Sequence, residues 1–193
     1  MKNRARIFIQ VALICLFVIT WAGCRATLSN QNGETPQANQ LNASPLPPPT
    51  GFVNDYSNVL DGDTKNRLET TLARLRERSN IEFAVALVYT TGGQPLNDYS
   101  LAVARGWKIG PKDSGGLLLL VVVKDHQWRI EVSRSLENDL PNDVALELGR
   151  LMNEPFRQQQ FGEGITKCVA AIIKRLAERR GFAASRDMRA PVF

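Results

Sequence analysis

Two apolar runs in the middle of the chain predict buried strands. Residues 81–89 (IEFAVALVY) are almost continuously apolar, and residues 117–123 (LLLLVVV) are apolar at every position. Runs of this length and composition are typical of strands that are covered on both faces. Residues 128–132 instead alternate apolar and polar, and the polar stretch 124–127 before them is typical of a turn. The pattern predicts that 117–123 and 128–132 form a β-hairpin.

Four further stretches have helical periodicity and capping signals: residues 64–79, 97–107, 141–153 and 162–180. Asp61 or Asp63 can cap the first helix, and Asn97 is expected to cap the second. Gly181 is a typical C-terminal stop for the last. The order of the elements predicts an α/β fold in which helices pack over a small mixed sheet. The strands 81–89 and 117–123 are expected to be parallel neighbours.

The first 23 residues have the pattern of a secretory signal peptide. They contain no acidic residue, begin with three basic ones and continue as an apolar run over 7–22. These 16 residues are fewer than the roughly 20 that a membrane-spanning helix needs. Secretion therefore explains the segment better than a permanent span, although a short uncleaved anchor stays an alternative.

The signal ends in Trp-Ala-Gly-Cys at residues 21–24, which resembles the lipobox of bacterial lipoproteins. Trp21 departs from the usual Leu, while the two small residues before Cys24 match. The resemblance implies cleavage before Cys24 and lipid attachment to it. In the alternative interpretation, Cys24 is an incidental thiol.

Composition then divides the chain into four parts: a signal peptide (1–23), a linker rich in Pro, Asn and Gln (24–50), a folded domain (51–182) and a C-terminal tail (183–193). The linker cannot bury enough apolar area to offset its ordering entropy, so we expect it to be disordered. Its Pro-rich end is expected to be a stiff spacer. The domain would be exported and tethered to a membrane on the periplasmic or extracytoplasmic face.

Charge and single reactive residues exclude several function classes. The chain has 24 basic and 19 acidic residues, and three of the basic ones lie in the signal, which leaves 21 and a net charge of +2. These charges are interleaved, so no nucleic-acid partner is expected. The only histidine, His126, lies in the predicted hairpin turn, and Cys168 falls on an apolar helical face. Neither a His/Cys zinc site nor a serine hydrolase is therefore expected.

Several short motifs have the order and spacing of a known family: Val53-Asn54-Asp55, Trp107-Lys108-Ile109-Gly110, Asp113-Ser114-Gly115-Gly116, Arg129-Ile130-Glu131-Val132 and Leu136-Glu137. Together they resemble the TPM domain, which occurs in a thylakoid-lumen acid phosphatase, a photosystem II repair factor, a nematode receptor modulator and bacterial envelope proteins. The resemblance covers about residues 52–180. It implies a three-layer α/β/α sandwich. Some members of the family bind calcium or another divalent cation, and phosphatase activity has been proposed for a few. The resemblance therefore implies a candidate cation site and a candidate phosphatase activity for this chain.

A hairpin that turns around residues 125 and 126 predicts where two carboxylates meet. In that register Gly116 faces about Ser135, so Asp113 and Glu137 lie together at one end of the sheet. Carboxylate and amide oxygens gathered there are the ligands that calcium accepts. Asp55 joins this predicted metal site through the family pattern alone. The alternative is that Asp113 and Glu137 cap turns and face water.

One departure from the family pattern affects this site. Ser133-Arg134-Ser135 occupies the position where the family usually has Gly-Tyr-Gly. A guanidinium beside a cation site weakens it by repulsion, but it can also attract a phosphate.

Two functions remain for the sequence. The first is a membrane-tethered, non-enzymatic envelope module that binds a cation or a partner and supports an envelope protein complex. The second is a divalent-metal-dependent phosphatase in which Asp55, Asp113 and Glu137 hold the ion.

Overall fold

The computed structural model describes residues 44–110 and 114–183. The elements follow in the order β1 (Val53–Asp55), α3 (Gly62–Ser79), β2 (Ile81–Val88), α4 (Leu96–Gly106), β3 (Gly115–Val122), β4 (Gln127–Val132), the 3₁₀ turn η1 (Arg134–Leu136), α5 (Asn142–Gly149), η2 (Arg150–Met152), α6 (Asn153–Arg157) and α7 (Phe161–Arg180). The predicted strands and helices are all present, with ends shifted by a few residues. The predicted helix 141–153 is divided into α5 and η2, and β1 was not predicted.

The described strands form one mixed sheet in the order β1-β2-β3-β4. Strands β1, β2 and β3 are parallel, and β4 is antiparallel to β3. This confirms both the parallel connection from β2 to β3 and the hairpin from β3 to β4. Because β3 pairs with β2 along its whole length and with β4 from Leu117 to Val122, it is an interior strand of the sheet.

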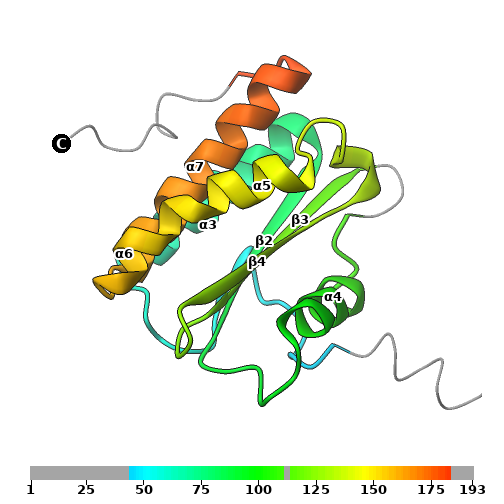
Figure 1. The fold of residues 1–193 in the computed structure, drawn as a ribbon. Coiled ribbons are helices and arrows are strands. Elements are labelled where there is room, and N and C mark those ends of the chain that lie inside the picture. Colours follow the sequence, from blue (N-terminus) through cyan, green and yellow to red (C-terminus); the bar gives the residue numbers. More distant parts are fainter. Residues whose placement is uncertain (1–43, 111–113, 184–193) are drawn as a thin grey trace, which may run out of the picture. The chain divides into compact units, whose positions relative to one another are not determined.

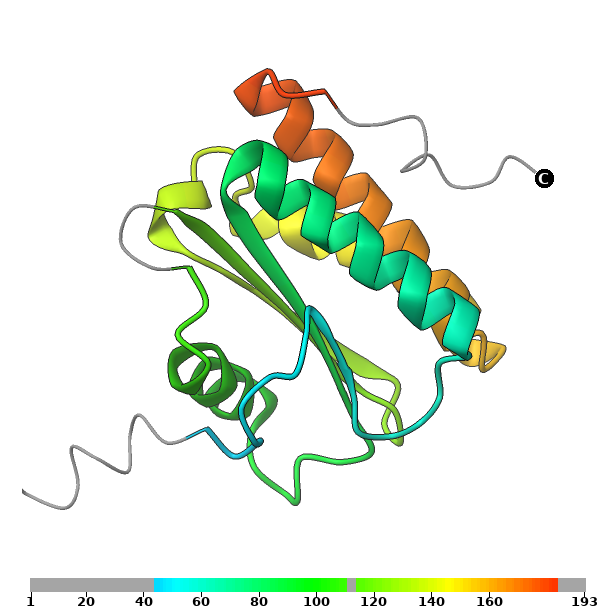
Figure 2. The ribbon, with the colours of Figure 1, turned by 180° about the vertical axis from the view of Figure 1, so that it is seen from behind.

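Helices cover both faces of the sheet. Helices α3, α5 and α7 lie together on one face, and α4 lies on the other (Figures 1 and 2). Along β3, Leu117, Leu119 and Val121 belong to the core under α3 and α7. The residues between them, Leu118, Leu120 and Val122, belong to the core under α4. The three-layer α/β/α sandwich is therefore confirmed.

The helix ends show which capping predictions hold. Asp61 caps α3, and its carboxylate accepts a hydrogen bond from the Thr64 amide at 2.8 Å. The side chain and the backbone of Thr64 both lower the pKa of this carboxyl. Gly181 ends α7 in the left-handed conformation, as predicted. The prediction that Asn97 caps α4 is wrong: Pro95 is the capping residue, because the Tyr99 amide already bonds to the Pro95 carbonyl.

The register of the hairpin differs from the prediction by two residues. Leu117 pairs with Val132, and the Ser133 amide donates to the Gly116 carbonyl at 2.9 Å. Gly116 therefore faces Ser133 and not Ser135. The reason lies in the turn, which is centred slightly earlier than expected and closes through His126 in the left-handed conformation, with φ of 51°.

Among the residues that the structure describes, no helix has both the length and the apolar character needed to cross a membrane. The signal peptide, Cys24 and most of the linker lie outside the described residues, as does the tail from residue 184.

The burial of β3 on both faces generates a stability prediction. Leu119 and Leu120 point to opposite faces and are both fully buried. Changing either to Ala should lower the free energy of unfolding by about 2–5 kcal/mol, since each leaves a cavity in a different core. Denaturant unfolding measures both variants, with Leu151→Ala, at an exposed leucine, as the control. A nearly neutral effect at Leu119 or Leu120 would mean that one face of the sheet is open.

Candidate functional site

The sheet places two of the predicted metal ligands far apart. Asp55 ends β1 and pairs with Leu87, near the carboxyl ends of the parallel strands. Glu137 follows β4, whose last residues lie beside the start of β3, where Gly115 pairs with Ile81. Leu87 and Ile81 are six residues apart on β2, which at roughly 3.3 Å per residue separates the two ends by about 20 Å. The structure does not bring Asp55 and Glu137 together, so one ion cannot bind both.

The Asp55 carboxylate organises the loop between β1 and α3. One of its oxygens accepts hydrogen bonds from the amide and the hydroxyl of Ser57, at 3.0 and 2.9 Å. The other accepts from the Leu60 amide at 2.9 Å. Three donors on one carboxylate fix the path of the chain into α3. Asp55 therefore has a structural role as a turn-capping residue.

At the other end of the sheet, Glu137 is exposed, and Asp113 lies outside the described residues. The neighbouring Asp139 is already paired, because the Arg180 guanidinium lies 2.6 Å from its carboxylate. Arg180 also donates to the Ser135 carbonyl at 2.8 Å, and Arg175 donates to the Asp139 carbonyl at 3.2 Å. Arginines of α7 thus fasten the loop after β4, a contact that the sequence did not predict. They leave Glu137 as the unpaired carboxylate of this loop within the described part of the chain.

The serines of the Ser133-Arg134-Ser135 segment join the start of β3 to the end of β4. The Gly116 amide donates to the Ser133 hydroxyl at 2.8 Å, and the Ser133 and Ser135 hydroxyls lie 3.0 Å apart. Ser135 also donates to the Ser114 carbonyl at 3.3 Å. The Arg134 side chain between them is exposed. Both hydroxyls therefore have structural partners at this end of the sheet.

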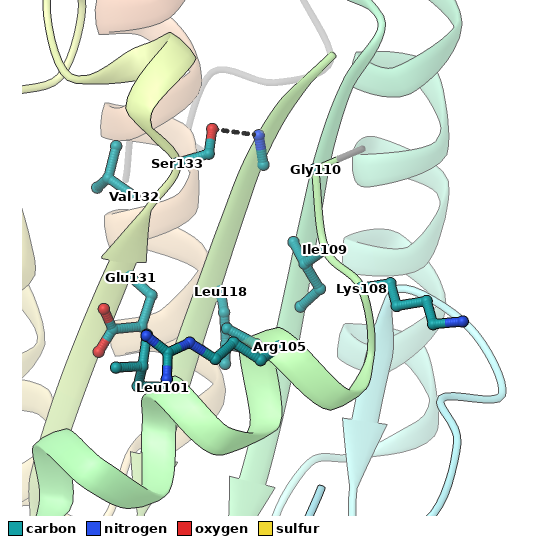
Figure 3. Close-up of a pocket in the computed structure, with 11 residues that line it drawn as sticks. Leu101, Arg105, Lys108, Ile109, Gly110, Leu118, Glu131, Val132 and Ser133 are labelled. Atoms are coloured by element: carbon teal, nitrogen blue, oxygen red, sulfur yellow. Dashed lines mark hydrogen bonds between the residues drawn. The ribbon is translucent and has the colours of Figure 1, made fainter. Parts of the chain in front are cut away.

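A groove of about 400 Å³ lies beside this end, between α4 and the strands β3 and β4. We call it the α4 groove. Figure 3 shows α4 along one side and the end of β4 along the other. The residues that line it include the apolar Leu101, Ala104, Ile109, Leu118 and Val132 and the polar or charged Arg105, Lys108, Glu131 and Ser133.

Two glycines shape the end of the α4 groove. Gly110 is in the left-handed conformation, with φ of 72°, and a Cβ atom added to it would lie 2.6 Å from the Cα atom of Gly116. A Cβ atom on Gly116 would lie 2.5 Å from the Cα atom of Gly110. The backbones meet so closely that a side chain at either position requires one of them to move. The contact brings the segment after α4 directly against the start of β3.

Lys108 also has a left-handed backbone, with φ of 55°, at the C-terminal end of α4. Its amide donates to the Arg105 carbonyl at 3.0 Å, and the Ile109 amide donates to the Ala104 carbonyl at 3.1 Å. This is the Schellman arrangement, in which glycine is the usual residue at the position of Lys108. A lysine is less favourable there than glycine, and its side chain points away from the groove, opposite Leu118 and Glu131 (Figure 3).

The remaining charges leave the groove positive. The Glu131 carboxylate accepts hydrogen bonds from the Ser100 hydroxyl at 2.5 Å and from Arg129 at 3.0 Å, so it is already neutralised. Within residues 44–110 and 114–183, no carboxylate forms an ion pair with Arg105 or Lys108. The α4 groove therefore combines apolar walls with one exposed cation, Arg105, and Lys108 lies at its rim.

Cys168 and His126 have the structural roles that the sequence predicted. Cys168 is fully buried, and burial raises the pKa of its thiol to about 12. The thiol is protonated at neutral pH and is therefore a poor nucleophile. His126 is exposed in the hairpin turn, with its ring 5.8 Å from that of Phe161. Across the described residues, no three His, Cys, Asp or Glu side chains gather where they could hold a metal ion.

Solved structures of bacterial proteins share this fold. An N-terminal domain from P. gingivalis, determined by NMR, is 27% identical with a TM-score of 0.63, over 71% of this chain and 88% of that one. The BA42 protein of the psychrophilic bacterium Bizionia argentinensis is 19% identical with a TM-score of 0.56, over 71% of this chain and 93% of that one. The N-terminal domain of the cg2496 protein of Corynebacterium glutamicum is 10% identical with a TM-score of 0.51, over 78% and 93%.

No curated protein matches the chain. The family model described as the TPM domain, however, matches residues 53–175, from β1 to the last turns of α7. This range contains the whole sheet and nearly all of both cores, as the resemblance of the short motifs implied. The match extends over more than half of the 193 residues, and the chain belongs to the TPM domain family.

Proposed function

We propose that this chain is a membrane-tethered accessory module of the cell envelope, whose TPM domain binds a partner or a cation and has no catalytic role of its own. The observation that carries the proposal is the α4 groove, which is apolar along its walls and has Arg105 as an exposed cation. An open groove of this composition suits an extended partner that presents apolar and acidic groups. In this proposal the partner belongs to an envelope protein complex.

The polar groups near the groove support a binding role. The Ser133 hydroxyl and the Glu131 carboxylate are held by neighbouring residues. Asp139 is held by Arg180. These groups are engaged in contacts within the protein. A nucleophile or a general base would need a free lone pair directed at a substrate, so these groups favour a binding role over a catalytic one.

The tether is the second part of the proposal. Cleavage before Cys24 and lipid attachment to its thiol would leave the domain on the outer face of a membrane, at the end of the Pro-rich linker. The signal pattern in residues 1–23 supports export, and the small residues before Cys24 support lipid attachment.

Mass spectrometry of the mature N-terminus tests the anchor. We expect the first residue to be Cys24, carrying acyl chains, and Cys24→Ser should release the domain from the membrane fraction, because the remaining chain has no other proposed anchor. Cys168→Ser is the matched control and should leave the domain with the membrane. An intact Met1 in the membrane fraction, or an unmodified Cys24, would contradict the proposal.

A divalent cation is proposed at the end of the sheet that carries Glu137. Asp113 lies in sequence between Gly110 and Ser114, which are both at this end, so it stays a proposed ligand together with Glu137. Asp55 is at the opposite end and leaves the set. The described donors fit calcium only in part, because Asp139 is paired with Arg180. With so few carboxylates, the affinity for calcium would be low.

Calcium should raise the melting temperature of the protein. The stabilisation should follow RT ln(1 + [Ca²⁺]/Kd) and disappear on chelation. Asp113→Asn and Glu137→Gln should each abolish the response, since both remove a proposed ligand. Asp55→Asn is the matched control: it should lower the melting temperature, because the loop loses hydrogen bonds, while the response to calcium stays. A parent protein with no response at millimolar calcium would leave only the partner-binding role.

The alternative function is a metal-dependent phosphatase. Arg105 favours it, since the α4 groove lies beside the proposed cation site and a guanidinium can bind phosphate oxygens. An assay for hydrolysis of a generic phosphomonoester in the presence of calcium therefore distinguishes the two functions. We expect the parent protein to hydrolyse this substrate no faster than the Asp113→Asn variant does. Metal-dependent hydrolysis that this variant loses would establish the phosphatase and overturn the accessory role.

A further inference from the structure

The Pro-rich segment before β1 is packed against the domain. Residues 44–50 run beside α4 and β1 (Figure 2). Leu46 is half-buried and packs against the core under α4, which contains Tyr99, Val103 and Trp107. The prolines on either side of Leu46 are exposed. One apolar side chain therefore holds the segment on the domain.

Two aromatic side chains bind the backbone of this segment. The Trp107 indole donates a hydrogen bond to the Pro47 carbonyl at 2.9 Å, and the Tyr56 hydroxyl donates to the same oxygen at 3.5 Å. Trp107 is only 8% exposed. Without this carbonyl its N–H group would be largely buried with no acceptor, which costs free energy.

Both ends of the segment are also fixed. A Cβ atom added to Gly106, the last residue of α4, would lie 2.5 Å from the Ser44 amide nitrogen, so the two backbones touch. At the other end, the side chain of the buried Asn54 accepts a hydrogen bond from the Thr50 amide at 2.8 Å. The same side chain donates to the Gly51 carbonyl at 2.9 Å.

The sequence of the segment restricts its backbone to extended conformations before it binds. Four of its residues from 45 to 49 are prolines, which fix φ, and a residue that precedes proline is restricted to extended conformations. The segment loses little conformational entropy when it binds. Aromatic surfaces that donate a hydrogen bond to a proline-rich backbone are a general means of recognising such segments.

We propose that Trp107, Tyr56 and Tyr99 form a recognition site for a proline-rich segment, and that the chain's own residues 45–49 occupy this site in cis. Leu46 is the apolar anchor of this ligand, and the Pro47 carbonyl is its acceptor. The linker is therefore bound to the domain over its last residues. It reaches the domain at the C-terminal end of α4, the end that carries Arg105 and Lys108. This inference is independent of the proposed partner and cation.

Hydrogen exchange in the full chain tests the site. In the parent, the Trp107 indole N–H and the Thr50 amide should exchange slowly. Leu46→Asp should speed both by about tenfold, the change expected when about one hydrogen bond is lost, while the amides of β3 stay as protected as before. Leu151→Asp, at an exposed leucine on another surface, is the matched control and should change neither group. Equal exchange in the parent and in Leu46→Asp would overturn the proposal.

A peptide with the sequence of residues 42–51 tests recognition directly. Added to the Leu46→Asp chain, it should shift the NMR signal of the Trp107 indole and restore its slow exchange. Added to the parent, it should have no effect, because the site is filled. A peptide that leaves the Leu46→Asp chain unchanged would contradict recognition. Protection in the parent that falls on dilution would show that a second copy supplies the segment, and would contradict binding in cis.

A second pair of variants separates recognition from general stability. Trp107→Phe keeps an aromatic ring but removes the donor, so the Thr50 amide should exchange faster. Trp128→Phe removes an indole that donates to Asn153 at 2.9 Å, away from the segment. It should leave the Thr50 amide unchanged. Equal effects of the two variants on Thr50 would show a general loss of stability and overturn the assignment.

Discussion

The burial of β3 on both faces is the constraint on which the rest of the structure depends. Each side chain from Leu117 to Val122 is inaccessible to solvent, so neither face of the sheet can be left open. One core lies under α3 and α7, and a second lies under α4. Because α4 is the main cover of its face, its position is set by the need to bury Leu118 and Leu120. The α4 groove and the Trp107 site both exist because this one helix has to lie there.

Features that depend on local pattern could be predicted from the sequence. The fully apolar run in β3 indicated burial on both faces, and the periodicity of the long helices placed α3 and α7 within a few residues. Strand β1 was missed because three residues are too short to show a period. The hairpin register was displaced by two residues because the turn is centred slightly earlier than predicted, with His126 in the left-handed conformation, which is uncommon for residues other than glycine. A turn that is slightly misplaced in sequence changes every pair along the strand.

The candidate site was harder to predict, because residues close in a family pattern need not be close in space. Asp55 and Glu137 belong to one pattern, but a parallel β1 carries Asp55 to the opposite end of the sheet from Glu137. The sequence of β1 contains no signal for that direction. Asp139, next to this predicted site, is paired with Arg180, which α7 brings to it from 41 residues further along the chain. The α4 groove likewise requires the contact of two glycine backbones, and no spacing in the sequence indicates such a contact.

The short segment from Trp107 to Gly110 links features that the sequence presents as separate. Trp107 binds the end of the linker, Lys108 lies at the rim of the groove, and Gly110 packs against Gly116 at the start of β3. The hydrogen bonds that close α4 fix the backbone of all these residues together. A displacement of the linker would leave the Trp107 indole at the end of α4 without its acceptor. The end of the linker and the α4 groove therefore contact the same short segment, whose backbone is fixed by the end of α4.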